Sequence, residues 1–265
     1  MCFFLILLHS VTTTIMEQRG LNSFMNIPLV TKNLIIINVL FGLATVIMSK
    51  IDLIAILGLH YPAANDFRLY QLITYMFMHG SLAHIFFNMF AIYMFGRVLE
   101  SVWGPKRFLT YYMITGIGAG LINILVAYIR IKSIEANLDS ETISMIYSEG
   151  GSILKQSRNY TNSTFGQLNL LINTTTIGAS GAVFGILLAF GMLFPNIEML
   201  IIPIPFPIKA KYLVTLYGVI ELFTGIANFS FDNIAHFAHL GGMLFGIILV
   251  LYWRKKDRNN GKYFY

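Results

Sequence analysis

Six apolar segments, each close to the length that crosses a membrane, constrain this chain more than any other feature. A helix needs about 20 predominantly apolar residues to span the hydrocarbon of a bilayer. Charged residues make up 11% of the chain, against roughly 25% in an average soluble domain. Because this charge is too small to cover a water-facing surface, we expect an all-α membrane protein with six transmembrane helices. The segments run over 33–49, 82–99, 108–129, 177–194, 212–228 and 236–253.

Glycines gather in two of these segments and predict close helix packing. In lipid, small residues let helix backbones approach one another. We therefore expect the third and sixth segments to contact neighbouring helices at Gly116, Gly118, Gly120, Gly241, Gly242 and Gly246.

The distribution of Lys and Arg predicts the orientation. Placing both termini in the cytoplasm puts 12 of the 18 basic residues on the inner side and 6 on the outer side, as the positive-inside rule requires. The net charge of +6 therefore reflects membrane topology, and we expect no nucleic-acid partner. An integral protein of a bacterial inner membrane fits this pattern. A single cysteine, Cys2, excludes an internal disulfide framework.

We expect one membrane domain over residues 25–253, preceded by an extension and followed by a basic tail. Residues 1–24 carry an apolar run too short to span, and Met25 is a plausible natural start. The polar stretch 131–176 is expected outside the membrane, either partly disordered or folded into short helices over the outer face. The basic cytoplasmic tail covers residues 254–265.

Polar groups inside three segments mark a candidate active site. Ser180 opens the fourth segment, His84 and Asn88 lie in the second, and His239 lies in the sixth. Burying such groups in hydrocarbon is costly, so they are a functional-site hypothesis by default. The predicted orientation brings all four to one depth on the outer side. A serine hydroxyl beside a histidine base is the pattern of nucleophilic catalysis.

Each motif also has an alternative explanation. The sequence around Ser180 is typical of helix packing, and it is not a nucleophile elbow, because position 182 is Ala and no strand precedes it. His79 and His84 are five residues apart and form no HExxH zinc motif, so we expect no metal and no cofactor. A membrane transporter would distribute its polar groups along a path through the whole membrane, whereas these groups share one depth.

The motifs together resemble those of the rhomboid intramembrane serine proteases. The resemblance rests on HGSLAHIFFN with His79, His84 and Asn88, on Gly178-Ala179-Ser180-Gly181, and on AHLGGMLFG with His239 and Gly242. Gly96, Glu100 and Gly104 match a Gly-x-x-x-Glu-x-x-x-Gly element of that family. The resemblance implies a rhomboid-like bundle in which Ser180 is the nucleophile and His239 the general base. It also implies that His84, Asn88 and the Ser180 N–H bind the oxyanion and that His79 supports loop structure.

Two positions depart from the family pattern. Phe184 stands where a tyrosine often stacks on the catalytic histidine, so the ring keeps its face and loses its hydroxyl. Tyr70-Gln71 replaces a Trp-Arg pair of the first outer loop, so the hydrogen bonds of that loop are not carried over directly.

We expect a two-residue Ser180–His239 dyad, because the sequence shows no acidic residue beside His239. Asp232 precedes the sixth segment, Glu221 lies in the fifth without an assigned role, and His236 is a candidate for secondary support. The expected substrates are single-span membrane proteins, cleaved near the outer face. A catalytically silent relative that binds membrane proteins is the alternative, which the presence of both dyad residues disfavours. The oligomeric state does not follow from the sequence.

Overall fold

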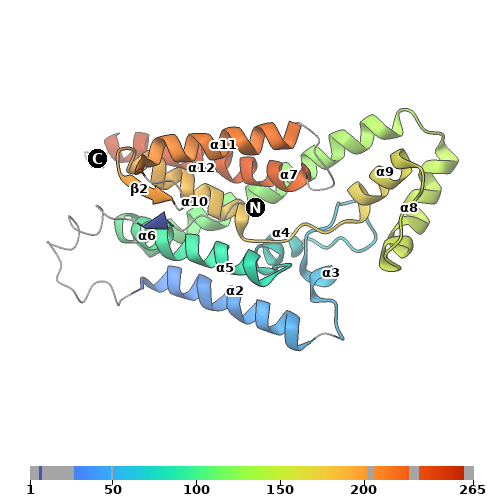
Figure 1. Cartoon of the computed structure of the whole chain (residues 1–265), viewed down its shortest axis with the longest axis horizontal. Helices are drawn as coiled ribbons and strands as arrows, with labels where there is room; N and C mark the ends of the chain where they lie inside the picture. Colours follow the sequence, from blue (N-terminus) through green and yellow to red (C-terminus); the bar gives the residue numbers. More distant parts are fainter. Residues whose placement is uncertain (1–5, 8–26, 49, 202–205, 227–232, 260–265) are drawn as a thin grey trace.

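The computed structural model describes residues 6–7, 27–48, 50–201, 206–226 and 233–259 as an elongated bundle of helices (Figure 1). Most of the predicted extension 1–24, the end of the basic tail and Asp232 lie outside the described residues. The six predicted segments all form helices. These are α2 (Leu29–Ile47), α5 (Leu82–Ala91) with its continuation, α7 (Pro105–Glu135), α10 (Ser180–Leu193), α11 (Ala210–Ile226) and α12 (Asn233–Asn259).

Four helical stretches are long and apolar enough to cross a membrane, among the described residues. They are Leu29–Ile47, Leu82–Trp103, Pro105–Glu135 and His236–Asn259. The 14 residues of α10 correspond to about 21 Å at 1.5 Å per residue, less than the ~30 Å of bilayer hydrocarbon. Most side chains of α10 are buried in the bundle, so it forms an inner element with little surface left for lipid.

The second apolar segment is one helical stretch with a wider turn inside it. α5 continues through a π-helical turn, η3 (Ile92–Gly96), into α6 (Arg97–Trp103). Gly104, with φ of +78°, separates α6 from α7. An L side chain rarely adopts this backbone conformation, whereas glycine does so readily.

Helices α7, α10 and α12 form the tightly packed centre, as the glycine pattern predicted. A Cβ added to Gly118 would lie 2.4 Å from the Phe245 ring, and one added to Gly241 would lie 2.7 Å from Ile122. The Tyr111 hydroxyl, itself fully buried, donates to the Gly185 carbonyl at 2.7 Å. The remaining glycines of the prediction also lie close to their neighbours. An added Cβ would lie 2.0 Å from Met76 at Gly116, 3.0 Å from Leu59 at Gly120, 2.4 Å from the Tyr111 hydroxyl at Gly246, and 1.9 Å from the backbone of Gly181 at Gly242.

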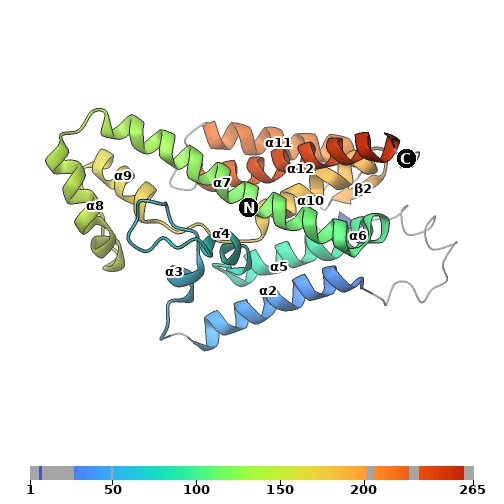
Figure 2. The same cartoon turned by 180° about the vertical axis from the view of Figure 1, so that it is seen from behind.

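The polar stretch 131–176 is folded into helices. α7 continues to Glu135, followed by α8 (Ser140–Lys155) and α9 (Ser163–Asn173). α8 and α9 pack with the last turns of α7 around a small apolar core, and the two helices lie at the end of the bundle opposite the C-terminal end of α12 (Figure 2). The core consists of Ile131, Ile146, Leu168 and Ile172.

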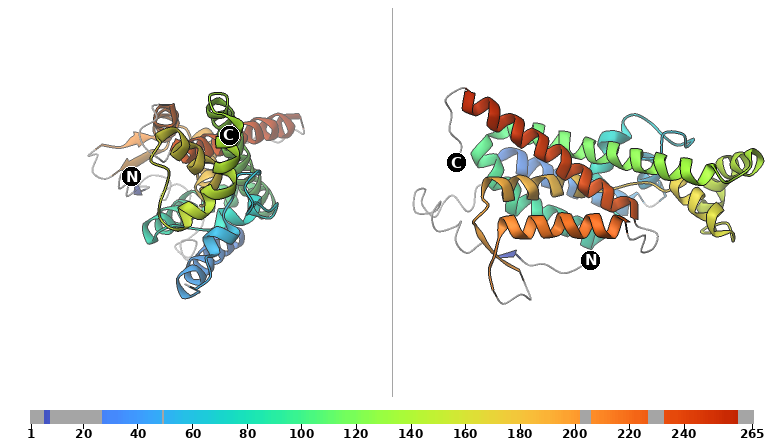
Figure 3. Two further views of the ribbon diagram at one scale, coloured as in Figure 1. Left: turned by 90° about the vertical axis from the view of Figure 1, so that its right-hand side faces the viewer. Right: turned by 90° about the horizontal axis from the view of Figure 1, so that it is seen from above.

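Short elements complete the chain at both ends of the bundle. Between α2 and α5 lie α3 (Leu53–Leu57), α4 (Gln71–Thr74) and the 3₁₀ turn η2 (Tyr75–Phe77). A small antiparallel sheet with the order β1-β2-β3 lies at the same end of the bundle as the C-terminal end of α12, on the opposite side of the molecule (Figure 3). The central strand β2 (Glu198–Ile201) pairs with β1 (Ile6–Leu7), and Leu200 lies opposite Leu7. On its other side β2 pairs with β3 (Ile208–Lys209), and Glu198 lies opposite Lys209.

Candidate active site

Ser180 is the first residue of α10, directly after a turn that only glycine fits. Gly178 in this turn has φ of +123°, which L side chains rarely adopt. A Cβ on Gly178 would lie 2.8 Å from two atoms of the His84 ring and 3.6 Å from Ser180 Oγ. The Gly178 N–H donates to the Tyr75 carbonyl at 2.9 Å. The glycine therefore allows the serine hydroxyl and the His84 imidazole to lie in one narrow space.

His239 of α12 faces Ser180 at hydrogen-bond distance. Its Nε2 lies 2.9 Å from Ser180 Oγ. Gly181 and Gly242 permit this approach, because a Cβ on Gly242 would lie 1.9 Å from the Gly181 carbonyl oxygen. A hydroxyl within hydrogen-bond reach of an imidazole nitrogen is the arrangement that activates a nucleophile.

Phe184 lies one helical turn after Ser180 and stacks on His239. The two ring centroids are 4.2 Å apart and the rings are inclined by 9°. Positions four apart lie on the same face of a helix, so Ser180 and Phe184 meet the same imidazole from one side of α10. The face of the phenyl ring fixes the plane of His239 without needing a hydroxyl.

The expectation that no acidic residue lies beside His239 is wrong. Glu221 of α11 is buried, and its Oε2 lies 3.0 Å from His239 Nδ1. The contact lacks the alignment of a regular hydrogen bond, since Nδ1 has no hydrogen-bond partner among the described residues. It is a close electrostatic contact between a carboxylate and the ring nitrogen opposite Ser180. Glu221 is the only Asp, Glu, Lys, Arg or His of segment 212–228, which is the signal that marked it.

His236 shares the same carboxylate oxygen. Its Nδ1 lies 2.6 Å from Glu221 Oε2, and its ring is T-shaped to that of His239 at 6.4 Å. Among the described residues, these three form the single group of His, Cys, Asp or Glu whose donor atoms could hold one metal ion. One donor atom from each lies within 4.8 Å of the others.

His84 and Asn88 approach the site from α5. Ser81 caps this helix, its Oγ accepting the His84 N–H at 3.1 Å. Asn88 is 5% exposed, and its Nδ2 is buried with no hydrogen-bond partner among the described residues. α5 packs against α10, which carries Ser180. His84 and Asn88, which both carry side-chain N–H groups, thus belong to a helix that packs against α10. The His84 ring also lies next to Gly178 in the turn before Ser180.

His79 packs against His84 just before α5. The two rings are T-shaped with centroids 4.9 Å apart, and His79 Nδ1 lies 3.3 Å from the Phe77 carbonyl oxygen. Burial and the neighbouring His84 lower the pKa of His79 to about 4. His79 is therefore a neutral ring that supports the turn and the position of His84.

Glu100 lies away from the serine and holds the start of α2. It is buried, and its carboxylate accepts hydrogen bonds from the backbone N–H of Val30 at 2.9 Å and of Thr31 at 2.7 Å. The Thr31 hydroxyl donates a third at 2.7 Å. A carboxylate at a helix N-terminus satisfies orphan N–H groups and complements the helix dipole. Glu100 therefore anchors α2 and has no contact with the reacting groups.

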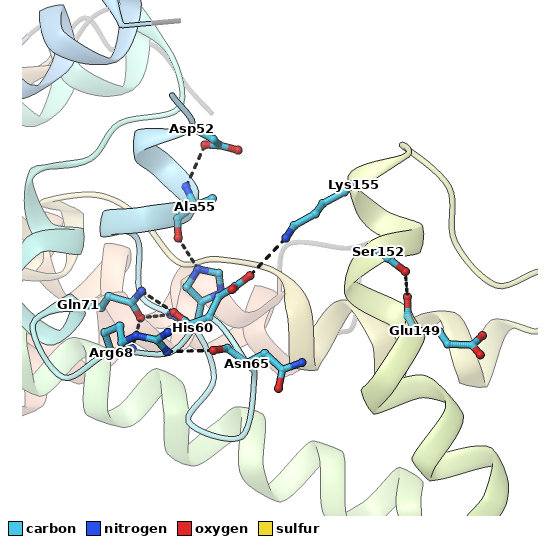
Figure 4. A network of polar contacts seen from close by, with 10 residues as sticks. Asp52, Ala55, His60, Asn65, Arg68, Gln71, Glu149, Ser152 and Lys155 are labelled. Carbon is cyan, nitrogen blue, oxygen red and sulfur yellow. Dashed lines mark hydrogen bonds and ion pairs between the residues drawn. The ribbon is translucent and has the colours of Figure 1, made fainter. Parts of the chain in front are cut away.

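Gln71 organises the loop between α2 and α4, a role that the sequence did not suggest (Figure 4). It is fully buried and its amide makes four backbone contacts. Its Nε2 donates to the Ile56 carbonyl at 3.1 Å and to the Asp66 carbonyl at 2.9 Å. Its Oε1 accepts hydrogen bonds from the backbone N–H of Arg68 at 3.0 Å and from the backbone N–H of His60 at 3.4 Å. An amide carries both donors and acceptors, so one side chain can satisfy both kinds of backbone group.

The same loop is joined to α8. Lys155 Nζ lies 3.6 Å from Asp66 Oδ2, and both side chains are exposed. Figure 4 shows Lys155 reaching from α8 toward the loop around His60. This exposed pair contributes little to stability, but it shows that α8 and the first loop lie side by side.

A family model of the rhomboid domain matches residues 66–256. The match includes every residue described above around Ser180. An uncharacterized mitochondrial rhomboid protein of Schizosaccharomyces pombe is 26% identical over 74% of this chain and 56% of its own length. Rhomboid-like protein 11 of Arabidopsis thaliana, a chloroplastic protein, is 28% identical over 68% of this chain and 51% of its own.

A bacterial relative carries an activity in its name. Rhomboid protease AarA of Providencia stuartii is 26% identical over 66% of this chain and 52% of its own length. The chain thus spans about half the length of these relatives.

Proposed function

The chain belongs to the rhomboid family, and from that premise we propose that it is an intramembrane serine endopeptidase. Ser180 is the nucleophile and His239 the general base. The observation that carries the proposal is the 2.9 Å contact between Ser180 Oγ and His239 Nε2, at the meeting point of α10 and α12.

Acylation requires that the serine proton has an acceptor. His239 Nε2 takes the Ser180 proton as Oγ attacks the scissile carbonyl, and the resulting imidazolium later gives this proton to the leaving amine. Phe184 holds the plane of the ring throughout, because the stacking at 4.2 Å leaves little room for the ring to tilt. The products of this step are an acyl-serine and a released amine.

The tetrahedral intermediate needs donors for its oxyanion. We assign this role to the Ser180 backbone N–H together with the side chains of His84 and Asn88. The buried Asn88 Nδ2 without a partner among the described residues supports the assignment, because a donor held ready for charge that develops in the transition state costs no reorganisation.

Glu221 extends the dyad to a charge-assisted triad. A carboxylate 3.0 Å from His239 Nδ1 favours the tautomer with hydrogen on Nδ1, which leaves Nε2 as the acceptor for the serine proton. The same carboxylate stabilises the imidazolium that forms. In deacylation, His239 takes a proton from water, which then attacks the acyl-serine.

The helix bundle and the distribution of Lys and Arg support the proposed membrane arrangement. We propose that residues 25–253 form one domain, with α10 and α11 completing a bundle of six helices in the bilayer. The stretch containing α8 and α9 lies outside and both termini lie in the cytoplasm, as in a bacterial inner membrane. Single-span membrane proteins are the proposed substrates, cleaved near the outer face. His79, Gly178, Gly181 and Gly242 support the site through packing, and Glu100 supports the bundle by anchoring α2.

Reconstitution tests the proposal. The purified protein in liposomes is expected to cleave a single-span test substrate, and a fluorophosphonate probe is expected to label it. Ser180→Ala and His239→Ala should lower kcat by about 10⁶-fold or to background, with unchanged helical circular dichroism. A protein that binds the substrate without cleavage or labelling would instead be a silent relative, and the enzymatic proposal would fail.

A further inference from the structure

Glu221, His236 and His239 converge from two helices on one point beside the catalytic serine. One oxygen, Glu221 Oε2, lies 2.6 Å from His236 Nδ1 and 3.0 Å from His239 Nδ1. The Glu221, His236 and His239 side chains are 11%, 27% and 18% exposed, so the cluster is largely shielded from solvent but not completely buried. We propose that it is a binding site for a divalent transition-metal ion, and that a bound ion switches the serine off.

The donor set suits such an ion. Two imidazole nitrogens and one carboxylate are a ligand set that zinc uses in proteins, with an open fourth position. Tetrahedral zinc at about 2.0–2.1 Å from nitrogen keeps its ligands roughly 3.3 Å apart. The donors already lie within 4.8 Å of one another, so small rotations of the side chains bring them to this spacing. Imidazole and carboxylate together favour zinc and its neighbours over calcium or magnesium.

The site differs from the catalytic pair in the atom of His239 that it uses. Catalysis needs Nε2 without hydrogen, facing Ser180 Oγ at 2.9 Å. A metal ion on Nδ1 displaces the hydrogen of that nitrogen, and in the neutral ring the hydrogen then resides on Nε2. No proton leaves the protein in this exchange. With hydrogen on Nε2, His239 can no longer accept the serine proton.

Binding is tested first, without reference to activity. Calorimetric titration of the metal-free Ser180→Ala protein in detergent with zinc chloride is expected to show one saturable equivalent. Cobalt(II) should give the visible absorption bands of a tetrahedral complex. His236→Ala and Glu221→Ala should each weaken zinc binding by about tenfold or more, since even the loss of an outer-shell partner costs this much.

A matched control separates this site from the other histidine pair of the bundle. His79 and His84 have ring centroids 4.9 Å apart and do not belong to the cluster of Glu221, His236 and His239. His84→Ala is expected to leave zinc affinity unchanged. Zinc binding that disappears with His84→Ala and persists in His236→Ala would overturn the assignment, as would the absence of saturable zinc binding to the Ser180→Ala protein.

The switch rests on the proposed function and is tested by labelling. Zinc should slow fluorophosphonate labelling of Ser180 in the wild-type chain over the concentration range in which it binds, and EDTA should restore it. Zinc binding with unchanged labelling would overturn the switch. Absence of labelling in the metal-free wild type would instead overturn the enzymatic proposal, while the calorimetric result for the site would stand.

Discussion

The burial of the Asn88 side-chain donor is consistent with its proposed role in binding the oxyanion. An unpaired donor shielded from water costs roughly 1–3 kcal/mol, and Asn88 Nδ2 is such a donor among the described residues. In the proposed mechanism, this cost is recovered when the Asn88 amide donates to the oxyanion. A residue kept only for packing would be better replaced by an apolar one of the same shape.

The first prediction at this scale follows from that contrast. Asn88→Leu, similar in shape and without the donor, is expected to lower kcat by on the order of 10²-fold while the melting temperature in detergent is unchanged or raised. The measurement is cleavage of a single-span substrate together with a thermal melt. A variant with full turnover would remove Asn88 from the oxyanion site.

Glu221 gives a second prediction. Glu221→Gln keeps the size of the side chain and removes its charge, so the imidazolium of the transition state loses its partner. We expect kcat to fall by about 10²-fold with little change in KM, in steady-state assays of the reconstituted protein. The matched control is Glu141→Gln on the exposed first turn of α8, which should retain activity. Equal activity of both variants would return the site to a two-residue dyad.

At the scale of helices, the site depends on how closely α10 and α12 approach. Ser180 is on one helix and His239 on the other, and the Gly181 carbonyl lies where a Cβ of residue 242 would be. Any side chain there pushes the helices apart by more than a hydrogen bond tolerates.

Gly242→Ala is therefore expected to abolish cleavage and to lower the melting temperature. The control is Gly218→Ala on α11, whose added Cβ would meet only the flexible end of Met243, at 3.2 Å. That variant should retain most of its activity. Full activity of Gly242→Ala in the same assay would show that the helix contact is not what sets the distance between Ser180 and His239.

The apolar segments and the motif residues were readable from the sequence because each is a local pattern. The helices formed where hydropathy predicted them, and the glycines lie at helix contacts. The pairing of Glu221 with His239 was not readable, since it depends on which face of α11 meets α12. The short length of α10 also depends on neighbours, because it is buried among them. The structural role of Gln71 could not be predicted, because a single amide in a loop is not part of a repeating hydrophobic pattern or a known motif.

At the scale of the whole molecule, the two ends of the bundle are formed by different elements. The α8 and α9 helices lie at one end, while the start of α2 and the end of α12 lie at the other (Figure 1). We therefore expect a bilayer around the four long apolar helices to separate α8 from the C-terminal end of α12.

Cysteine labelling tests this separation. In a Cys2→Ser background, Ser152→Cys on α8 should react with an impermeant maleimide added outside intact cells. Asn259→Cys at the end of α12 should react only after the membrane is opened. Both positions are exposed. Reaction of both from the same side would contradict the arrangement, and reaction of Asn259→Cys alone from outside would reverse it.

The π-helical turn η3 has a consequence for the rotation of one helical stretch along its own axis. Asn88 precedes this turn in α5, which packs against α10, whereas Glu100 follows it and holds α2, and both residues are buried. A π turn contains more residues than an α turn, so it shifts the angular phase of everything after it. An uninterrupted α-helix of the same length would turn Glu100 by roughly 100° relative to Asn88, the rotation that one residue adds to an α-helix. The π turn therefore sets the angle between the two halves of this helical stretch. The first half carries the proposed oxyanion donors His84 and Asn88, and the second half carries Glu100, which anchors α2.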